Sequence, residues 1–266
     1  MRKVGLVGLG VIGRAICRAA DGGKLPLELV AVHTRTEATA RAFLATLERP
    51  PLLTDLAGVV GRSELVVEAA GGPAVDAVAR AALGAGKDLM VLSVGALLER
   101  EDLVALARER GCRIFAPSGA MVGLDGVKSA SAGRIDSVTM TTRKPPGSLK
   151  DAPLVRQKGL RLEELREPAV IFEGNALEAC KAFPANVNVS AAVSLAGVGP
   201  RRTLIRIVCD PTIERNTHDV EVTGEFGKFS MHIEGVPSEN MRTGVLSYLS
   251  AVATLRDLSA TLVVGT

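Results

Sequence analysis

The sequence predicts an α/β protein in which a doubly wound parallel sheet is followed by a second domain of the α+β class. Three observations indicate this fold. Short apolar runs alternate with helical stretches over residues 1–117, and a glycine-rich turn follows the first of these runs. After Pro117 several strand-like segments follow one another without helices between them, which is typical of a mixed or antiparallel sheet.

Near-continuous runs of Val, Leu, Ile and Met in the first domain predict strands that are covered on both faces, as in a parallel sheet. Strands are expected at residues 3–8, 27–33, 64–70, 88–93 and 112–117. Helices are expected between them at residues 12–20, 36–47, 74–86 and 100–111. Right-handed crossovers between these strands then give a doubly wound sheet.

The second domain is expected over residues 118–239. Its strands are expected at residues 137–144, 169–174, 203–210, 218–226 and 228–235, and its helices at 175–183 and 186–197. Residues 145–153 contain Pro, Gly and Ser and are expected to form a surface loop. The terminal segment 240–266 is expected to contain an amphipathic helix over 243–258, whose apolar face could pack back on the first domain.

The composition argues against several classes of function. The 32 basic and 29 acidic residues are scattered, and the chain has no tryptophan, so no nucleic-acid surface is expected. No apolar stretch is long enough to span a membrane, and no signal peptide is expected. The four cysteines lack metal-site spacing. Together these features indicate a cytoplasmic protein with reduced thiols, no bound metal and a small-molecule substrate.

Residues 8–13, with the sequence GLGVIG, follow the first strand and open the first helix. Gly8 allows a tight turn, Gly10 lets the backbone approach a pyrophosphate, and Gly13 lets the helix pack closely on the strand. The N-terminus of the helix then faces the phosphate charge. Because the motif lies inside a repeated strand–helix pattern, it predicts a dinucleotide site. The expected cofactor contacts are Gly8, Gly10, Val11, Ile12 and Gly13.

The end of the second strand lacks the acidic residue that usually binds the ribose 2′-hydroxyl of NAD. His33, Thr34 and Arg35 occupy this place. Thr34 and Arg35 could hold a 2′-phosphate, so NADP is expected to be accepted as well as NAD. Alternatively, Arg35 is only a solvated residue at the start of the second helix, and NAD binds less tightly.

Small residues end the third and fourth strands, in the segments EAAGGP (68–73) and LSVGAL (92–97). Ligands of doubly wound sheets lie beyond the carboxyl ends of the strands. Ala70 and Gly71 are therefore expected to line the cofactor site. Ordinary turn chemistry explains the same residues equally well.

The second domain offers two histidines, the residue type best suited to proton transfer near neutral pH. Alternation along the strand places His218 on the apolar face with Val220 and Val222. His232 lies on the polar face of its strand and is expected to be solvated. The pattern alone favours a buried core histidine at position 218 over a catalytic one.

Two further groups of polar residues could bind substrate or cofactor. Asn186 and Asn188 stand at a predicted helix start, where one of them could instead be the N-cap. Arg143 and Lys144 end a predicted strand and could bind carboxylates, although at least one of them is expected to be simply solvated. The candidate substrate ligands are Arg143, Lys144 and Asn186.

Segments across almost the whole chain resemble the L-aspartate dehydrogenases. They are GLGVIG, VVEAAG, LSVGAL, PSGAMVGLDGVKSA, TRKPP, FEGNALEACKAFPANVNVSAAVSLAG, DPTIERNTHDVEVTGEFG and VPSENMRTG. The resemblance implies a Rossmann-type domain joined to an α+β catalytic domain, usually as a homodimer. It also implies NAD(P)-dependent oxidation of L-aspartate through iminoaspartate to oxaloacetate and ammonia, or the reverse amination, with a link to NAD biosynthesis.

The resemblance also assigns residues. His218 of the N-x-H stretch corresponds to the catalytic residue, and Ala120 and Asn188 correspond to cofactor contacts. As a general acid/base, His218 would accept a proton from the ammonium group or from water and later protonate the departing amine. The missing acid after the second strand departs from the family pattern and argues against a strict NAD preference.

Two rival functions fit parts of the sequence. One is another two-domain NAD(P)-dependent reductase of oxo- or imino-acids, such as a homoserine dehydrogenase-like or dihydrodipicolinate reductase-like enzyme. The other is a non-catalytic protein that senses dinucleotides, which would need no inward histidine in the second domain.

Overall fold

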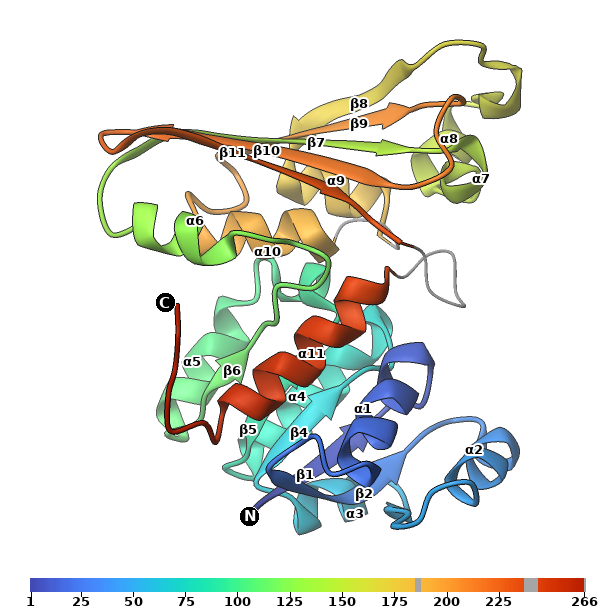
Figure 1. Cartoon of the computed structure of the whole chain (residues 1–266), viewed down its shortest axis with the longest axis vertical. Helices are drawn as coiled ribbons and strands as arrows, with labels where there is room; N and C mark the ends of the chain where they lie inside the picture. Colours follow the sequence, from blue (N-terminus) through green and yellow to red (C-terminus); the bar gives the residue numbers. More distant parts are fainter. Residues whose placement is uncertain (185–187, 237–243, 266) are drawn as a thin grey trace. The chain divides into compact units, whose positions relative to one another are not determined.

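The computed structural model describes residues 1–184, 188–236 and 244–265. The chain divides into two compact units, each with its own sheet (Figure 1). Unit 1 comprises Met1–Pro117 and Tyr248–Val263, and unit 2 comprises Ser118–Ser247 and Val264–Thr266.

The sheet of unit 1 has six strands in the order β3-β2-β1-β4-β5-β6, and every neighbouring pair is parallel. Its strands are β1 (Arg2–Val7), β2 (Leu27–His33), β3 (Leu52–Leu53), β4 (Leu65–Glu68), β5 (Asp88–Val91) and β6 (Ile114–Phe115). This strand order is that of the Rossmann fold, so the predicted fold class of the first domain is confirmed. The order reverses between β1 and β4, and dinucleotides bind at the carboxyl ends of the strands at such a reversal.

Helices cover both faces of this sheet (Figure 1). They are α1 (Val11–Asp21), α2 (Glu37–Leu44), α3 (Leu56–Arg62), α4 (Val75–Gly84) and α5 (Glu101–Glu109). Val4 and Leu6 of β1 pack in one cluster with Ile16 of α1. Val7 of the same strand packs in the other cluster with Val78 of α4. Because neighbouring residues of β1 are buried on opposite faces, an apolar strand is what this position requires.

The terminal helix α11 (Val245–Asp257) contributes to the core of unit 1. Ala251 and Leu255, one turn apart, are fully buried in the same cluster as Val4 and Leu6. Among the described residues, no helix is both long enough and apolar enough to cross a bilayer.

Two elements of unit 1 were not predicted from the sequence. The segment 50–62 contains β3 and α3, where no element was expected, because its two-residue strand is too short for periodicity and its helix contains two glycines. Asp55 begins α3 by accepting a hydrogen bond from the Gly58 N–H at 2.8 Å. The strand expected at 112–117 contracts to β6, which pairs with β5 at the edge of the sheet.

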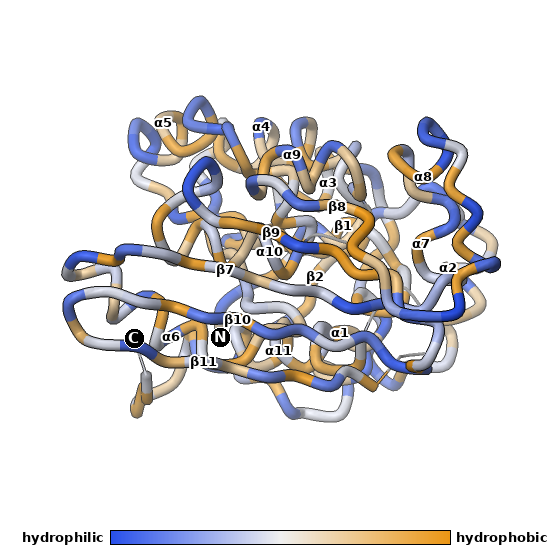
Figure 2. The backbone as a smooth tube through the Cα atoms, turned by 90° about the horizontal axis from the view of Figure 1, so that it is seen from above, coloured by the Kyte–Doolittle hydropathy of each residue, from blue (hydrophilic) through white to orange (hydrophobic). Residues whose placement is uncertain are grey.

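Unit 2 is built on a mixed sheet of five strands in the order β11-β10-β7-β9-β8. Its strands are β7 (Ile135–Lys144), β8 (Ala169–Asn175), β9 (Thr203–Cys209), β10 (Thr217–Gly224) and β11 (Gly227–Glu234). β7 pairs with β9 in parallel, and the other pairs are antiparallel. Hydrophobic and hydrophilic segments alternate along these strands (Figure 2). The predicted α+β class of this domain is therefore confirmed.

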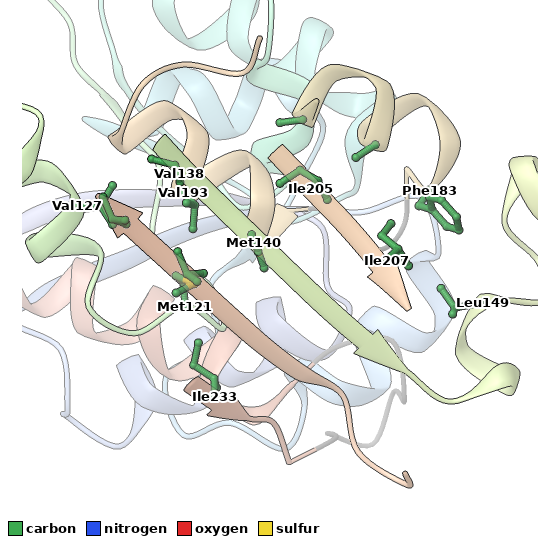
Figure 3. Close-up of a cluster of buried hydrophobic side chains, with 14 of the residues drawn as sticks. Met121, Val127, Val138, Met140, Leu149, Phe183, Val193, Ile205, Ile207 and Ile233 are labelled. Atoms are coloured by element: carbon green, nitrogen blue, oxygen red, sulfur yellow. The ribbon is translucent and has the colours of Figure 1, made fainter. Parts of the chain in front are cut away.

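One face of this second sheet is covered by helices α6 (Leu124–Ala130), α9 (Ala176–Ala182) and α10 (Asn188–Ala196) (Figure 1). The core between them is apolar, and Figure 3 shows Val138 and Met140 of β7 within it. The helices α6, α7 (Pro146–Leu149) and α8 (Pro153–Gln157) were not expected. The expected surface loop at 145–153 is wrong, because prolines begin both α7 and α8 and Leu149 is fully buried.

Candidate active site

The glycine-rich turn after β1 requires glycine at two positions. Gly8 has φ +104°, and a Cβ built there would lie 2.4 Å from the backbone of Ala69. A Cβ on Gly13 would lie 2.2 Å from the carbonyl oxygen of Gly8. At Gly10, by contrast, a Cβ would meet no described atom within 4 Å, so the backbone there faces open space.

Helix α1 starts directly after Gly10, with Val11 and Ile12 in its first turn. That turn contains no acidic residue, and Gly10 has no side chain that could cap the helix. The first N–H groups of α1 are therefore available to an anion, and the helix dipole favours negative charge there. The turn and the helix start fit the pyrophosphate of a dinucleotide.

The end of β2 carries no carboxylate. The Nδ1 atom of His33 lies 3.1 Å from the carbonyl oxygen of Thr54. Thr34 is half-buried and Arg35 is exposed. The next acidic residue, Glu37, pairs with Arg41 at 3.0 Å on the surface of α2. A ribose 2′-phosphate would thus meet no unpaired carboxylate in this segment.

Glu68, the last residue of β4, is a polar residue of the cofactor domain that sequence reasoning missed. It is fully buried, and the N–H groups of Ala70 and Gly71 donate to its Oε1 atom at 2.7 and 2.8 Å. Burial raises the pKa of Glu68, although the donors around it act in the opposite direction. A carboxylate at the end of an otherwise apolar strand was the signal that could have found it.

In unit 2, three polar side chains lie together on the covered face of the sheet. Thr142 and Lys144 lie two residues apart on β7 and therefore share one face of the strand. His218 of β10 is paired with Thr142 in the ladder. The Nδ1 atom of His218 lies 2.9 Å from the Thr142 hydroxyl. Each of the three residues is only 5% exposed. His218 is therefore buried, as strand alternation predicts, and it has two polar neighbours.

Burial and mutual charge set the protonation of this cluster. Burial and the charge of Lys144 lower the pKa of His218 to about 3, against a smaller opposite effect of Asp219. Burial lowers the pKa of Lys144 to about 8. Near neutral pH the site consequently holds a neutral imidazole, which can accept a proton, beside a cation.

Both parts of the chain match families of known proteins. Residues 125–258 match the family "Aspartate dehydrogenase, C-terminal", and residues 8–117 match "Homoserine dehydrogenase, NAD binding domain". An L-aspartate dehydrogenase of Methanosarcina acetivorans is 47% identical, with all of both chains covered. The chain belongs to the L-aspartate dehydrogenase family.

Other members and neighbours agree with this family. The L-aspartate dehydrogenase of Bradyrhizobium diazoefficiens is 47% identical over 99% of this chain and 94% of its own length. The crystal structure of an aspartate dehydrogenase from Thermotoga maritima covers all of both chains with a TM-score of 0.77 at 27% identity. A homoserine dehydrogenase from Thiobacillus denitrificans, with a TM-score of 0.63 at 16% identity, shares the fold alone. This member of the L-aspartate dehydrogenase family is thus an NAD(P)-dependent dehydrogenase, and the predicted cofactor, NAD or NADP, is confirmed.

Other residues predicted for the active site of this L-aspartate dehydrogenase family member lie outside the buried cluster of Thr142, Lys144 and His218. Arg143 lies on the opposite face of β7 from Lys144, and its guanidinium is 3.8 Å from Asp210. Ala120 is half-buried in the turn before α6, and Asn188 is exposed at the first residue of α10. Asn186 lies outside the described residues.

Asn216 is a further polar residue near His218 that the sequence reasoning did not single out. It continues β10 by one residue, because its carbonyl oxygen accepts from the Gly235 N–H at 2.9 Å. Its side-chain oxygen is buried and accepts no hydrogen bond from the described residues. A buried acceptor without a donor is costly, and a ligand ammonium or amide group would satisfy it.

Proposed function

We propose that this enzyme oxidises L-aspartate through iminoaspartate to oxaloacetate and ammonia, and catalyses the reverse amination. Full-length similarity to L-aspartate dehydrogenases supports the substrate. The observation that carries the chemistry is the buried cluster of Thr142, Lys144 and His218, which combines a proton acceptor with a cation. A protein that only senses dinucleotides has no need for such a cluster.

A bound NAD or NADP would supply the acceptor for the hydride that leaves the substrate α-carbon. The residues that would hold the dinucleotide are Gly8, Gly10, Val11, Ile12 and Gly13 of the turn and helix start, and Ala70 and Gly71 after β4. The family resemblance adds Ala120 and Asn188 as cofactor contacts. Thr34 and Arg35 would bind a 2′-phosphate, so NADP would be accepted as well as NAD.

His218 would be the general acid/base. When its Nδ1–H donates to the Thr142 hydroxyl, the Nε2 lone pair can accept a proton. It would take one from the substrate ammonium, because only a neutral amine can assist loss of hydride from the α-carbon. After that proton has passed to solvent, His218 would take another from the water that attacks the imine and give it to the departing amine.

Substrate binding would tune this histidine. A base with a pKa of about 3 is weak in the resting site. Aspartate carries two carboxylates, and a carboxylate beside Lys144 would offset the cation that lowers the pKa of His218. Binding the correct substrate would therefore strengthen the base at the moment when it is used.

Recognition of the two carboxylates would begin with Lys144. Its ammonium is buried on the same face as His218, whereas Arg143 points to the other face of β7. Of the predicted pair, Lys144 is thus the better supported carboxylate anchor. Asn216 would accept a hydrogen bond from the substrate ammonium, and Asn186 stays a candidate from the sequence.

The reaction is tested by following the near-ultraviolet absorbance of the reduced cofactor. Purified protein with L-aspartate and NAD⁺ or NADP⁺ should form the reduced cofactor, and oxaloacetate with ammonia should consume it. L-Glutamate and L-homoserine serve as controls. Turnover with homoserine instead of aspartate would assign the chain to the rival reductases, and cofactor binding without any turnover would favour the sensor.

We also propose a cytoplasmic homodimer. The family resemblance supports the dimer, and the free state of all four cysteines supports a reducing compartment. Light scattering of the purified protein tests the dimer, and a monomer mass at assay concentrations would contradict it.

A further inference from the structure

Glu68 collects hydrogen bonds from two turns at the carboxyl edge of the first sheet. Its Oε1 atom accepts from the N–H groups of Ala70 and Gly71 and from the Ser93 hydroxyl, at 2.7, 2.8 and 3.1 Å. Its Oε2 atom accepts from the Ser93 N–H at 3.1 Å. Glu68 is fully buried and Ser93 is 9% exposed, whereas Ala70 and Gly71 are half-buried.

The hydrogen bonds join two turns, and a third turn is in close contact with one of them. Ala70 and Gly71 belong to the turn after β4, and Ser93 follows β5. The turn after β4 also abuts the glycine-rich turn, since the backbone of Ala69 occupies the space that a Cβ on Gly8 would need. One carboxylate thus fixes the turns after β4 and β5 beneath the edge where the dinucleotide binds.

The chemistry of the contacts identifies the ionised form of Glu68. Every contact is a donor, and a carboxylate with two acceptor oxygens can satisfy them all. A buried carboxylate is costly unless it is fully hydrogen-bonded, which this one is. The same turn geometry in a neutral apolar environment would leave three N–H groups without acceptors.

We propose that Glu68 is a positioning residue of the cofactor site, which holds the turns after β4 and β5 in the shape that receives the nicotinamide half of the dinucleotide. A Rossmann sheet consists of two mononucleotide-binding halves. The half with β1, β2 and β3 carries the glycine-rich turn and the ribose position of the adenosine. Glu68 and Ser93 lie in the other half. The inference rests on the dinucleotide site and not on aspartate as the substrate.

The test compares ligands that occupy one half or both halves of the site, without any substrate present. In Glu68→Gln the amide nitrogen donates where an acceptor is needed, so one donor of the turns loses its partner. The dissociation constant of NADH and NADPH, measured by their fluorescence, should rise by about tenfold or more. The affinity for ADP and 2′,5′-ADP, measured by calorimetry, should stay unchanged because they lack the nicotinamide half.

Glu64→Gln is the matched control. Glu64 precedes the same strand, and its carboxylate also accepts a backbone N–H, from Lys3 at 2.7 Å, but at the opposite edge of the sheet. This variant should bind NADH, NADPH and ADP like the unaltered protein. If a folded Glu68→Gln variant binds NADH normally, or loses ADP to the same degree, the proposal is wrong.

Ser93→Ala keeps the proposal testable if Glu68→Gln does not fold. It removes only the hydroxyl donor and leaves the three N–H bonds in place. NADH should bind several-fold more weakly, with an unchanged affinity for ADP. An unchanged affinity for NADH in this variant would overturn the proposal.

Discussion

His218 and Lys144 show how burial decides the chemistry of single residues in this enzyme. Both side chains are ionisable, both are 5% exposed, and the ladder between β7 and β10 brings their strands together. The lysine charge and the low polarity of the core keep the imidazole neutral. Strand alternation predicted that His218 points inward, but Thr142 is 76 residues away in sequence, so no local pattern could have paired the two.

The depressed pKa of His218 makes the protein sensitive to acid. The unfolded state binds a proton near the ordinary pKa of 6.5, whereas the folded state does so only near 3. The contribution of His218 to stability is therefore fully present above pH 6.5 and is lost as the pH falls toward 3, by an amount on the order of 5 kcal/mol. Denaturation by urea at several pH values should show a shallower pH slope for His218→Gln. Equal slopes for both proteins would contradict the buried neutral state.

The role of Lys144 is separable from that of Arg143 by kinetics. Lys144→Ala removes the cation beside His218, so the KM for aspartate should rise by about tenfold or more. Arg143→Ala alters the neighbouring residue on the opposite face of β7 and should change KM much less. An unchanged aspartate KM in Lys144→Ala would mean that Lys144 is not a carboxylate anchor.

Cofactor choice is predicted to depend on Arg35. Because a charge-assisted hydrogen bond to a 2′-phosphate is lost, Arg35→Ala should raise the KM for NADP⁺ by about tenfold and leave that for NAD⁺ unchanged. Arg41→Ala is the control, since Arg41 is also exposed but already pairs with Glu37 at 3.0 Å. Equal effects of Arg35→Ala on both cofactors would favour the alternative that Arg35 is only solvated.

At the scale of the element, the sequence predicted those turns and helices in which each residue type meets a local backbone requirement. The glycine-rich turn was predictable because Gly8 needs positive φ and Gly13 needs close approach. Short elements could not be predicted, since β3 has two residues and α7 has four, too few to show a hydrophobic period. The hydrogen-bonded role of Glu68 was not predicted either, because its donor Ser93 is 25 residues further along the chain.

Helix α9 begins with a capping box that the sequence NALE carries. The Asn175 side chain accepts from the Glu178 N–H at 3.0 Å, and Glu178 accepts from the Asn175 N–H at 2.8 Å. Asn175→Ala should lower the free energy of unfolding by about 1 kcal/mol. Denaturation by urea measures this, and Asn175→Asp, which keeps a capping oxygen, should recover most of it. No loss in the alanine variant would show that the cap does not stabilise the helix.

At the scale of the whole molecule, the two candidate sites lie in different units. Unit 1 contains the six-stranded parallel sheet and the glycine-rich turn, and unit 2 contains the buried cluster with His218. The sequence left open whether the terminal helix returns to the first domain. Ala251 and Leu255 of α11 answer this, because they are buried in the core of unit 1. Amphipathicity alone could not predict this, since an apolar helix face indicates burial but not the surface against which the helix packs.

Under the proposed function, cofactor binding and catalysis should be separable, and His218→Ala tests this most directly. His232→Ala is the matched control, because His232 is exposed on the other face of the same sheet and pairs with Asp219 at 2.6 Å. His218→Ala should lower turnover of aspartate by roughly 10²–10⁴-fold. It should leave the affinity for NADH unchanged, and His232→Ala should retain both. Near-normal turnover in His218→Ala would contradict the central claim that this buried histidine transfers the proton.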